Sequence, residues 1–243
     1  MWAGTALAQL PPPLPAPAPD AITAMTVQPC PPDRNPVTDW PSLCRYRDAN
    51  RSVYRGPRAV LIGDSITDFW LNTAPGLFAT GVVDRGISGQ TCAQIETRFY
   101  QDVVRLAPRV AHIMCGTNDI AGNGGPTSPD DFANAMLAMV DMARANNIAV
   151  VIGTILPAGA FSWRTAYRPA TEIVALNGWL RDLAQQRGVI LADYYTAMAG
   201  PDGAMKPGLS NDGVHPNAAG YAVMEPIARA ALAQAERQAT RNP

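Results

Sequence analysis

The sequence has little charge, little histidine and no long apolar run, and each shortage excludes a class of protein. Charged residues make up 16% of the 243-residue chain, and 19 basic against 20 acidic side chains give a formal net charge of -1. The chain contains neither a basic stripe nor a run of like charges, so nucleic acid and an anionic membrane surface are not expected as partners. No apolar stretch is long enough to span a bilayer. With 47% hydrophobic residues, the composition is typical of a globular protein with a sizeable core.

Cysteine and histidine are also scarce, with four and two residues respectively. Their spacing resembles no metal site, so neither a metal nor another cofactor is expected. Cys30 and Cys44 flank a proline-containing stretch and predict a disulfide in an oxidising compartment, with two free thiols as the alternative. Cys92 and Cys115 fall inside expected core elements, and we interpret them as small hydrophobic side chains.

The N-terminal part of the chain differs in composition from the rest. Residues 6–9, Ala-Leu-Ala-Gln, resemble the cleavage site of a signal peptide, although the positive n-region and most of the apolar h-region are missing. The proline-rich stretch at 11–20 predicts an extended spacer. We therefore expect a truncated signal-like and Pro-rich segment at 1–20, an N-terminal extension at 21–57 and one large domain at 58–243. An ordinary Ala-rich tail is the alternative for the first residues.

Strand and helix signals alternate throughout the large domain. Short apolar runs predict buried strands at 58–62, 81–84, 110–114, 148–155 and 189–192. Apolar residues at helical spacing predict amphipathic helices between them, including 91–106, and a last helix that begins at Pro216. Strands buried on both faces and separated by helices imply an α/β fold, a three-layer α/β/α sandwich with a five-stranded parallel sheet. Ligands of such sheets bind beyond the carboxyl ends of the strands, so functional residues should follow strands directly.

Polar or glycine-rich motifs do follow the first three predicted strands. Ser65 lies between a strand and a helix, where its hydroxyl can face the cleft close to a helix N-terminus. Gly89 belongs to a glycine-containing loop that permits close approach of a backbone N–H to a ligand. Asn118 brings an amide side chain to the same edge. Each motif alone is more often a turn or a helix cap, but together they supply a nucleophile and oxyanion donors.

His215 is the strongest candidate for a general base. Asp212 precedes it by three residues in a glycine-containing turn, where a carboxylate can fold back onto the imidazole and fix its tautomer. Ser65, His215 and Asp212 then complete the inventory for acyl transfer.

Four other titratable residues are not assigned to the triad. His112 lies in the middle of the third strand and is expected to be a satisfied core or strand-edge residue. Asp64 is expected to hydrogen-bond its loop, and Asp119 to cap or brace the loop that carries it. Asp193, at the end of the fifth strand, competes with Asp212 for the acid role, but only Asp212 has the local geometry to reach the base.

Over roughly residues 58–235, the chain resembles the SGNH hydrolase family, also called the GDSL esterase/lipase family. The resemblance rests on four motif blocks, GDSIT (63–67), RGISGQT (85–91), GTND (116–119) and DGVHP (212–216). It implies the flavodoxin-like SGNH hydrolase fold for 58–243, and a triad of Ser65, Asp212 and His215. It also implies an oxyanion hole made by the backbone N–H groups of Ser65 and Gly89 and the side chain of Asn118. The first block has Ile-Thr where the family has Leu-Ser, which leaves the catalytic serine unchanged.

Within this family the sequence resembles the bacterial acetylesterase-like branch, whose members commonly deacetylate carbohydrates. It implies a serine carboxylic ester hydrolase that cleaves short-chain acyl esters, in particular acetyl esters of carbohydrate, through an acyl-enzyme. The expected partner is therefore a small acyl ester or an acetylated carbohydrate, and the N-terminal segment favours a periplasmic or secreted location. One alternative is a lipid hydrolase of the lysophospholipase or acyl-thioesterase type, against which the lack of a long apolar lid argues. The other is a non-catalytic carbohydrate-binding protein of the same fold, against which the intact triad argues.

Aromatic residues near the predicted site suggest where substrate is held. The loop at 157–169 follows the fourth strand and carries Trp163, Arg164 and Tyr167, which predict a substrate wall. Trp70, just past the nucleophile, predicts a second wall. Packing over the helices is the alternative for both.

Overall fold

The computed structural model describes residues 29–30, 39–53 and 56–239, and the segment predicted to be signal-like and Pro-rich, 1–20, lies outside them. The strands are β1 (Ala59–Gly63), β2 (Val82–Gly86), β3 (Val110–Met114), β4 (Ala149–Gly153) and β5 (Ile190–Ala192). The α-helices are α2 (Arg47–Ser52), α3 (Ser65–Thr73), α4 (Cys92–Asp102), α5 (Thr117–Ala121), α6 (Pro129–Ala145), α7 (Ala170–Arg187), α8 (Tyr194–Met198) and α9 (Ala218–Ala239). Two short 3-10 helices are η1 (Pro75–Thr80) and η2 (Val104–Leu106).

The five strands form one parallel sheet in the order β2-β1-β3-β4-β5, which confirms the predicted fold class. β1 lies between β2 and β3, and the strand order reverses around it. Gly63, the last residue of β1, pairs with Gly86 of β2 and Met114 of β3, so the three strands end side by side. Because ligands of doubly wound sheets bind where the order reverses, the segments after these three strands are placed to build a site.

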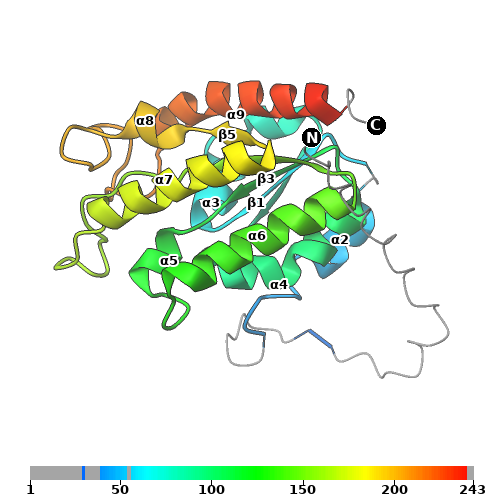
Figure 1. The fold of residues 1–243 in the computed structure, drawn as a ribbon, viewed down its shortest axis with the longest axis horizontal. Helices are drawn as coiled ribbons and strands as arrows, with labels where there is room; N and C mark the ends of the chain where they lie inside the picture. The colour runs from blue at the N-terminus through cyan, green and yellow to red at the C-terminus, as the bar shows by residue number, and fades with distance from the viewer. Residues whose placement is uncertain (1–28, 31–38, 54–55, 240–243) are drawn as a thin grey trace, which may run out of the picture.

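Helices cover both faces of the sheet, and each face has its own hydrophobic cluster. In β1, Val60 and Ile62 point toward the cluster that includes side chains of α4, α6 and α7, whereas Leu61 points toward the cluster that includes side chains of α3, α8 and α9. This alternation follows from the two-residue period of a strand, and it explains why strands covered on both faces appear as continuous apolar runs. Figure 1 shows α9 on one side of the sheet and α4 and α6 on the other.

Two helix boundaries differ from the predicted ones for local reasons. The helix expected at 91–106 ends at Asp102 and is followed by η2, after which Ala107 adopts a left-handed conformation with φ 50° before Pro108. The last helix begins at Ala218 rather than Pro216, because the Asn217 side-chain oxygen accepts the backbone N–H groups of residues 219 and 220 as an N-cap.

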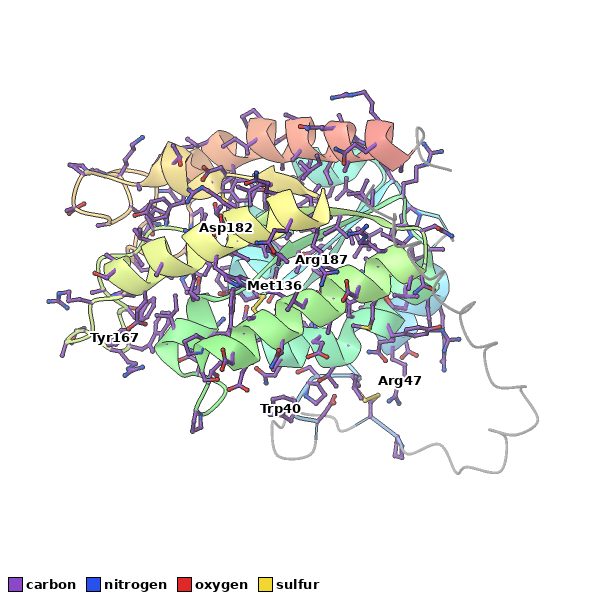
Figure 2. The ribbon with its side chains drawn as sticks, viewed as in Figure 1. Trp40, Arg47, Met136, Tyr167, Asp182 and Arg187 are labelled. Atoms are coloured by element: carbon purple, nitrogen blue, oxygen red, sulfur yellow. A yellow bond between two sulfur atoms is a disulfide. The ribbon has the colours of Figure 1, made fainter. Side chains whose placement is uncertain are left out.

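Residues 39–53 of the predicted N-terminal extension pack against α4 and the end of β2. Glutamine side chains of the domain donate to its backbone: Gln94 to the carbonyl of Trp40 at 2.8 Å, and Gln90 to that of Pro41 at 2.8 Å. The Tyr46 hydroxyl donates to the carbonyl of Gly86, the last residue of β2. Trp40 therefore lies on the α4 side of the molecule (Figure 2).

Candidate active site

Ser65 is the first residue of α3 and directly follows the turn at the end of β1. Asp64 caps the helix, because its Oδ1 accepts the backbone N–H of Ile66 at 2.9 Å. This cap holds the start of α3 at the carboxyl edge of the sheet, where the Ser65 Oγ lies 2.9 Å from Nε2 of His215. The nucleophile predicted from sequence and the predicted base are thus within hydrogen-bond distance, although 150 residues separate them.

His215 is oriented by the carboxylate of Asp212. Oδ2 of Asp212 lies 2.6 Å from Nδ1 of His215, while Oδ1 accepts the backbone N–H groups of Val214 at 2.9 Å and of His215 at 2.8 Å. Burial alone would raise the pKa of Asp212, but these hydrogen bonds outweigh it and lower the pKa to about 2. The ionised carboxylate accepts a hydrogen bond from the Nδ1–H group, which leaves Nε2 as an acceptor for the Ser65 hydroxyl.

The loops after β2 and β3 bring the predicted oxyanion donors to the same edge. Gly89 has φ 83°, a left-handed conformation that favours glycine, and nothing lies within 4 Å of the position where a Cβ would be. Asn118 is 3% exposed, and its Nδ2 donates to the carbonyl of Gln90 at 3.0 Å and lies 3.4 Å from Oδ2 of Asp64. The Asn118 amide is therefore held between the Gly89–Gln90 loop and the turn that precedes Ser65.

Arg98, which the sequence analysis did not single out, holds together the strand ends beneath these loops. Its guanidinium donates to the carbonyl of Gly63 at 3.0 Å, to that of Arg85 at 2.8 Å and to the side-chain oxygen of Gln90 at 2.6 Å. It also pairs with Asp102 at 3.0 Å, and both side chains are fully buried. A buried guanidinium with this many acceptors fixes the ends of β1 and β2 relative to the loop that follows β2. An arginine and an aspartate four residues apart on an amphipathic helix were the sequence signal for this pair.

Two buried aspartates brace the site. Burial raises the pKa of Asp64 to about 7, against the opposing hydrogen bond from Ile66 and the nearby charge of His215. Burial also raises the pKa of Asp119 to about 6, although its carboxylate accepts the backbone N–H of Cys92 at 3.0 Å. Both carboxylates accept backbone N–H groups, which agrees with the predicted bracing role.

Asp193, the predicted rival of Asp212, and His112, the other histidine, have partners outside the proposed triad. The Asp193 carboxylate accepts the backbone N–H of Thr196 at 3.1 Å as the cap of α8, and pairs with Arg181 at 3.2 Å. His112 is fully buried in β3, and its Nε2 lies 2.8 Å from the hydroxyl of Tyr194. Burial lowers the pKa of His112 to about 4.

The aromatic residues near His215 are only partly those expected. Trp163 is 42% exposed, and its ring centroid lies 6.3 Å from that of His215, in agreement with a wall at this position. The prediction for Trp70 is wrong: its side chain is fully buried and stacks on Tyr221 at 5.2 Å in the hydrophobic core. Phe69, which is 40% exposed and 5.3 Å from the His215 ring, takes the expected place.

The other two residues predicted for the wall, Arg164 and Tyr167, interact mainly with the protein. The Arg164 guanidinium donates to the carbonyl of Ala121 and lies 4.6 Å from the centre of the Tyr167 ring. The Tyr167 hydroxyl donates to Glu172 at the start of α7. Tyr167 also lines a cavity of about 620 Å³ between α6 and α7, whose lining includes Phe132 and Trp179. Tyr167 lies close to the start of α7, at the end of the loop that leads into this helix (Figure 2).

The interpretation of Cys92 and Cys115 as simple hydrophobic side chains is wrong, because they form a disulfide. Cys92 is the first residue of α4 and Cys115 directly follows β3, so the bond joins the segment after β2, which contains Gly89, to the segment after β3, which leads into α5 and Asn118. The pairing joins residues 23 apart, and the shared position of the two loops at the sheet edge was the only signal for it. The predicted Cys30–Cys44 disulfide is also formed.

Within the described residues, no cluster of histidine, cysteine, aspartate and glutamate side chains is arranged to hold a metal ion. In the same part of the chain, no helix has the length and apolar character needed to cross a membrane.

Comparison with known proteins gives a consistent family pattern. Residues 61–223 match the family model described as the GDSL-like Lipase/Acylhydrolase family. A Bacteroides fragilis protein assigned as an acylhydrolase is 38% identical, with a TM-score of 0.79 over 82% of this chain and 99% of that one. A GDSL-like lipase from Bacteroides thetaiotaomicron is 34% identical, with a TM-score of 0.78 over 81% of this chain and 99% of that one.

A more distant structure shares the fold alone. An acetyl xylan esterase from Geobacillus stearothermophilus, solved as a variant, is 18% identical, with a TM-score of 0.57 over 74% of this chain and 96% of that one. None of the curated protein sequences matches the chain.

Proposed function

This chain belongs to the GDSL-like lipase/acylhydrolase family, and from that premise we propose that it is a serine esterase that removes short acyl groups, in particular acetyl groups, from carbohydrate. The observation that carries the proposal is the series of two hydrogen bonds from Asp212 through His215 to the Ser65 hydroxyl, at 2.6 and 2.9 Å. A neutral imidazole that donates at Nδ1 and accepts at Nε2 is the arrangement that activates a serine hydroxyl.

In the proposed reaction, Ser65 Oγ attacks the ester carbonyl while His215 Nε2 takes the hydroxyl proton. The ionised Asp212 stabilises the imidazolium that forms. His215 then gives the proton to the departing alcohol oxygen, which leaves an acyl group on Ser65. Water, deprotonated by the same histidine, attacks the acyl carbonyl. The bond to Ser65 Oγ then breaks, His215 returns the proton to Oγ, and the carboxylic acid leaves.

The tetrahedral intermediate requires donors for its negative oxygen. We assign this role to the backbone N–H groups of Ser65 and Gly89 and to the side-chain amide of Asn118, which the loops after β1, β2 and β3 bring to one edge. Fixed donors of this kind act without reorganising during the reaction, and each typically contributes about 2.7–4 kcal/mol to the transition state.

The surroundings of His215 support a carbohydrate ester as substrate. Phe69 and Trp163 both lie partly exposed beside the imidazole, at ring distances of 5.3 and 6.3 Å. Partly exposed aromatic rings can pack against the apolar C–H surface of a sugar ring. The acetyl xylan esterase with the same fold supports the same substrate class.

We also propose that the protein works in the periplasm or outside the cell. Two disulfides, Cys30–Cys44 and Cys92–Cys115, support an oxidising compartment, because such bonds are rare in reducing cytoplasm. An acetylated polysaccharide is accessible in that location.

The proposal is tested by acetate release from acetylated xylan, pectin and peptidoglycan fragments, with Ser65→Ala as the blank. We expect Ser65-dependent release from at least one polysaccharide, and a steep loss of rate on p-nitrophenyl esters longer than butyrate. A rate that rises with acyl length would favour a lipid hydrolase instead. Failure of a fluorophosphonate probe to label Ser65 would leave a binding protein of the same fold.

A further inference from the structure

Three side chains beside the proposed oxyanion hole are hydrogen-bonded in series. The indole Nε1 of Trp163 donates to Oδ1 of Asn123 at 3.1 Å. Nδ2 of Asn123 donates to Oδ1 of Asn118 at 2.6 Å, and the Asn123 backbone N–H donates to the Asn118 carbonyl at 3.0 Å. The series therefore leads from an exposed aromatic ring beside His215 to the amide of Asn118.

The indole N–H of Trp163 determines which way the amide groups of Asn123 and Asn118 are oriented. An amide side chain can rotate by half a turn and exchange its oxygen for its NH₂ group, but an indole N–H can only donate. Trp163 therefore requires the oxygen of Asn123 to face it. The NH₂ group of Asn123 must then face Asn118, and this in turn requires the oxygen of Asn118 to face Asn123.

The orientation of the Asn118 amide determines where its NH₂ group points. With its oxygen occupied by Asn123, Asn118 points Nδ2 at the carbonyl of Gln90, at 3.0 Å, and toward the turn before Ser65. The reversed amide would place a carbonyl oxygen against the Gln90 carbonyl and against the negative oxygen of the intermediate. Only the observed orientation can donate to that oxygen.

Trp163 is held in place independently of Asn123. Its ring stacks on the buried Phe161 at 5.2 Å with an interplanar angle of 11°. The neighbouring Arg164 donates to the carbonyl of Ala121 in α5, the helix that carries Asn118. The indole N–H is thus a fixed reference for the two amides.

We propose that Asn123 is a positioning residue that keeps the NH₂ group of Asn118 directed at the reaction centre, and that the Trp163 N–H sets its orientation. The inference rests on the proposed function, because the orientation of Asn118 affects rate only if an oxyanion forms beside it. It also gives Trp163 two roles, as a wall beside His215 and as the origin of this hydrogen-bond series.

Asn123→Asp tests the proposal directly. The new carboxylate can still accept from Trp163 but cannot donate to Asn118, so it favours the reversed Asn118 amide. We expect kcat on p-nitrophenyl acetate to fall by about 10–100-fold, approaching the loss in Asn118→Ala, while KM changes less than about 2-fold. Asn134→Asp, at an exposed position on α6, adds the same charge and should leave kcat unchanged.

A double-mutant cycle separates orientation from other effects of the substitution. In the Asn118→Ala background, Asn123→Asp should change kcat by less than about 2-fold, because the amide on which it acts is gone. An equal loss in both backgrounds would mean that the added charge or a general disturbance lowers the rate, and would overturn the proposal. Full kcat in the single Asn123→Asp variant would overturn it as well.

A second variant tests the origin of the series without adding charge. Trp163→Phe keeps an aromatic ring but removes the N–H, so both Asn123 orientations become available and kcat should fall by about 2–5-fold. An unchanged kcat would remove Trp163 from the proposal.

Ser65→Ala distinguishes a failure of the proposed function from a failure of the positioning role. Hydrolysis that persists in Ser65→Ala overturns both. Hydrolysis that depends on Ser65 but is fully retained in Asn123→Asp overturns only the positioning role.

Discussion

Phe69 and Trp70 are neighbours in the chain but have different surroundings. On a helix, residues four apart lie on the same face, so Phe69 lies above Ser65 and beside His215. Trp70 is turned by a further 100° and points into the core, where it packs on Tyr221. The helical spacing from Ser65, and not closeness in sequence alone, identifies the aromatic residue beside His215.

The two aromatic residues should therefore fail in different ways when truncated. Trp70→Ala removes a fully buried side chain and should lower the free energy of unfolding by about 3–5 kcal/mol. Phe69→Ala should change that free energy by less than about 1 kcal/mol but raise KM for an acetylated xylo-oligosaccharide several-fold. Urea denaturation and steady-state kinetics measure the two effects. Equal KM changes on the oligosaccharide and on p-nitrophenyl acetate would argue against a sugar contact at Phe69.

At the scale of elements, the segments that follow β2 and β3 are linked to each other at three points. The Cys92–Cys115 disulfide, the hydrogen bond from Cys92 to Asp119 and the hydrogen bond from Asn118 to Gln90 all join the start of α4 to the segment after β3. Three links between two short loops restrict how far the proposed oxyanion donors can separate.

Loss of this disulfide should affect both stability and rate. Replacing Cys92 and Cys115 by alanine opens a loop with a sequence separation of 23 residues, and the chain-entropy model gives a loss of about 3 kcal/mol in the free energy of unfolding. We also expect kcat to fall several-fold, because the proposed oxyanion donors are then held less firmly. The loss should be no larger, because the two hydrogen bonds between these segments remain. The matched variant, Cys30→Ala with Cys44→Ala, should leave kcat unchanged, because that bond joins segments outside the site. A double variant of Cys92 and Cys115 with full kcat would show that the disulfide serves stability alone.

The features of the fold and of the candidate site that could be predicted from sequence are those that depend on residues close together in the chain. The five strands were predicted to within a few residues, because an apolar run bounded by glycine or proline is a local signal. The residues of the proposed triad were identified through short motifs that each follow a strand or precede a helix. Strand order, the Cys92–Cys115 bond and the contacts of Arg98 with the ends of β1 and β2 join different elements of the fold, and a local pattern does not reveal them.

At the scale of the whole molecule, buried ionisable groups make stability depend on pH in opposite directions. Burial raises the pKa of Asp64 and of Asp84 to about 7, so the folded state holds protons there that the unfolded state releases above about pH 4. This contribution stabilises the fold in acid and is lost as the pH rises to about 7. His112 acts in the opposite sense, because burial lowers its pKa to about 4.

The contribution of His112 can be isolated by comparison with His112→Gln, whose amide can keep a hydrogen bond to the Tyr194 hydroxyl. Between pH 6.5 and 4 the unfolded chain binds a proton at His112 that the folded chain excludes, so the wild type loses up to about 3 kcal/mol as the pH falls. The variant lacks this loss while keeping the contributions of Asp64 and Asp84. Urea denaturation at several pH values should therefore show the variant gaining stability relative to the wild type as the pH falls from 6.5 to 4. A difference that stays constant over this range would mean that His112 is charged, or equally able to become charged, in the folded protein.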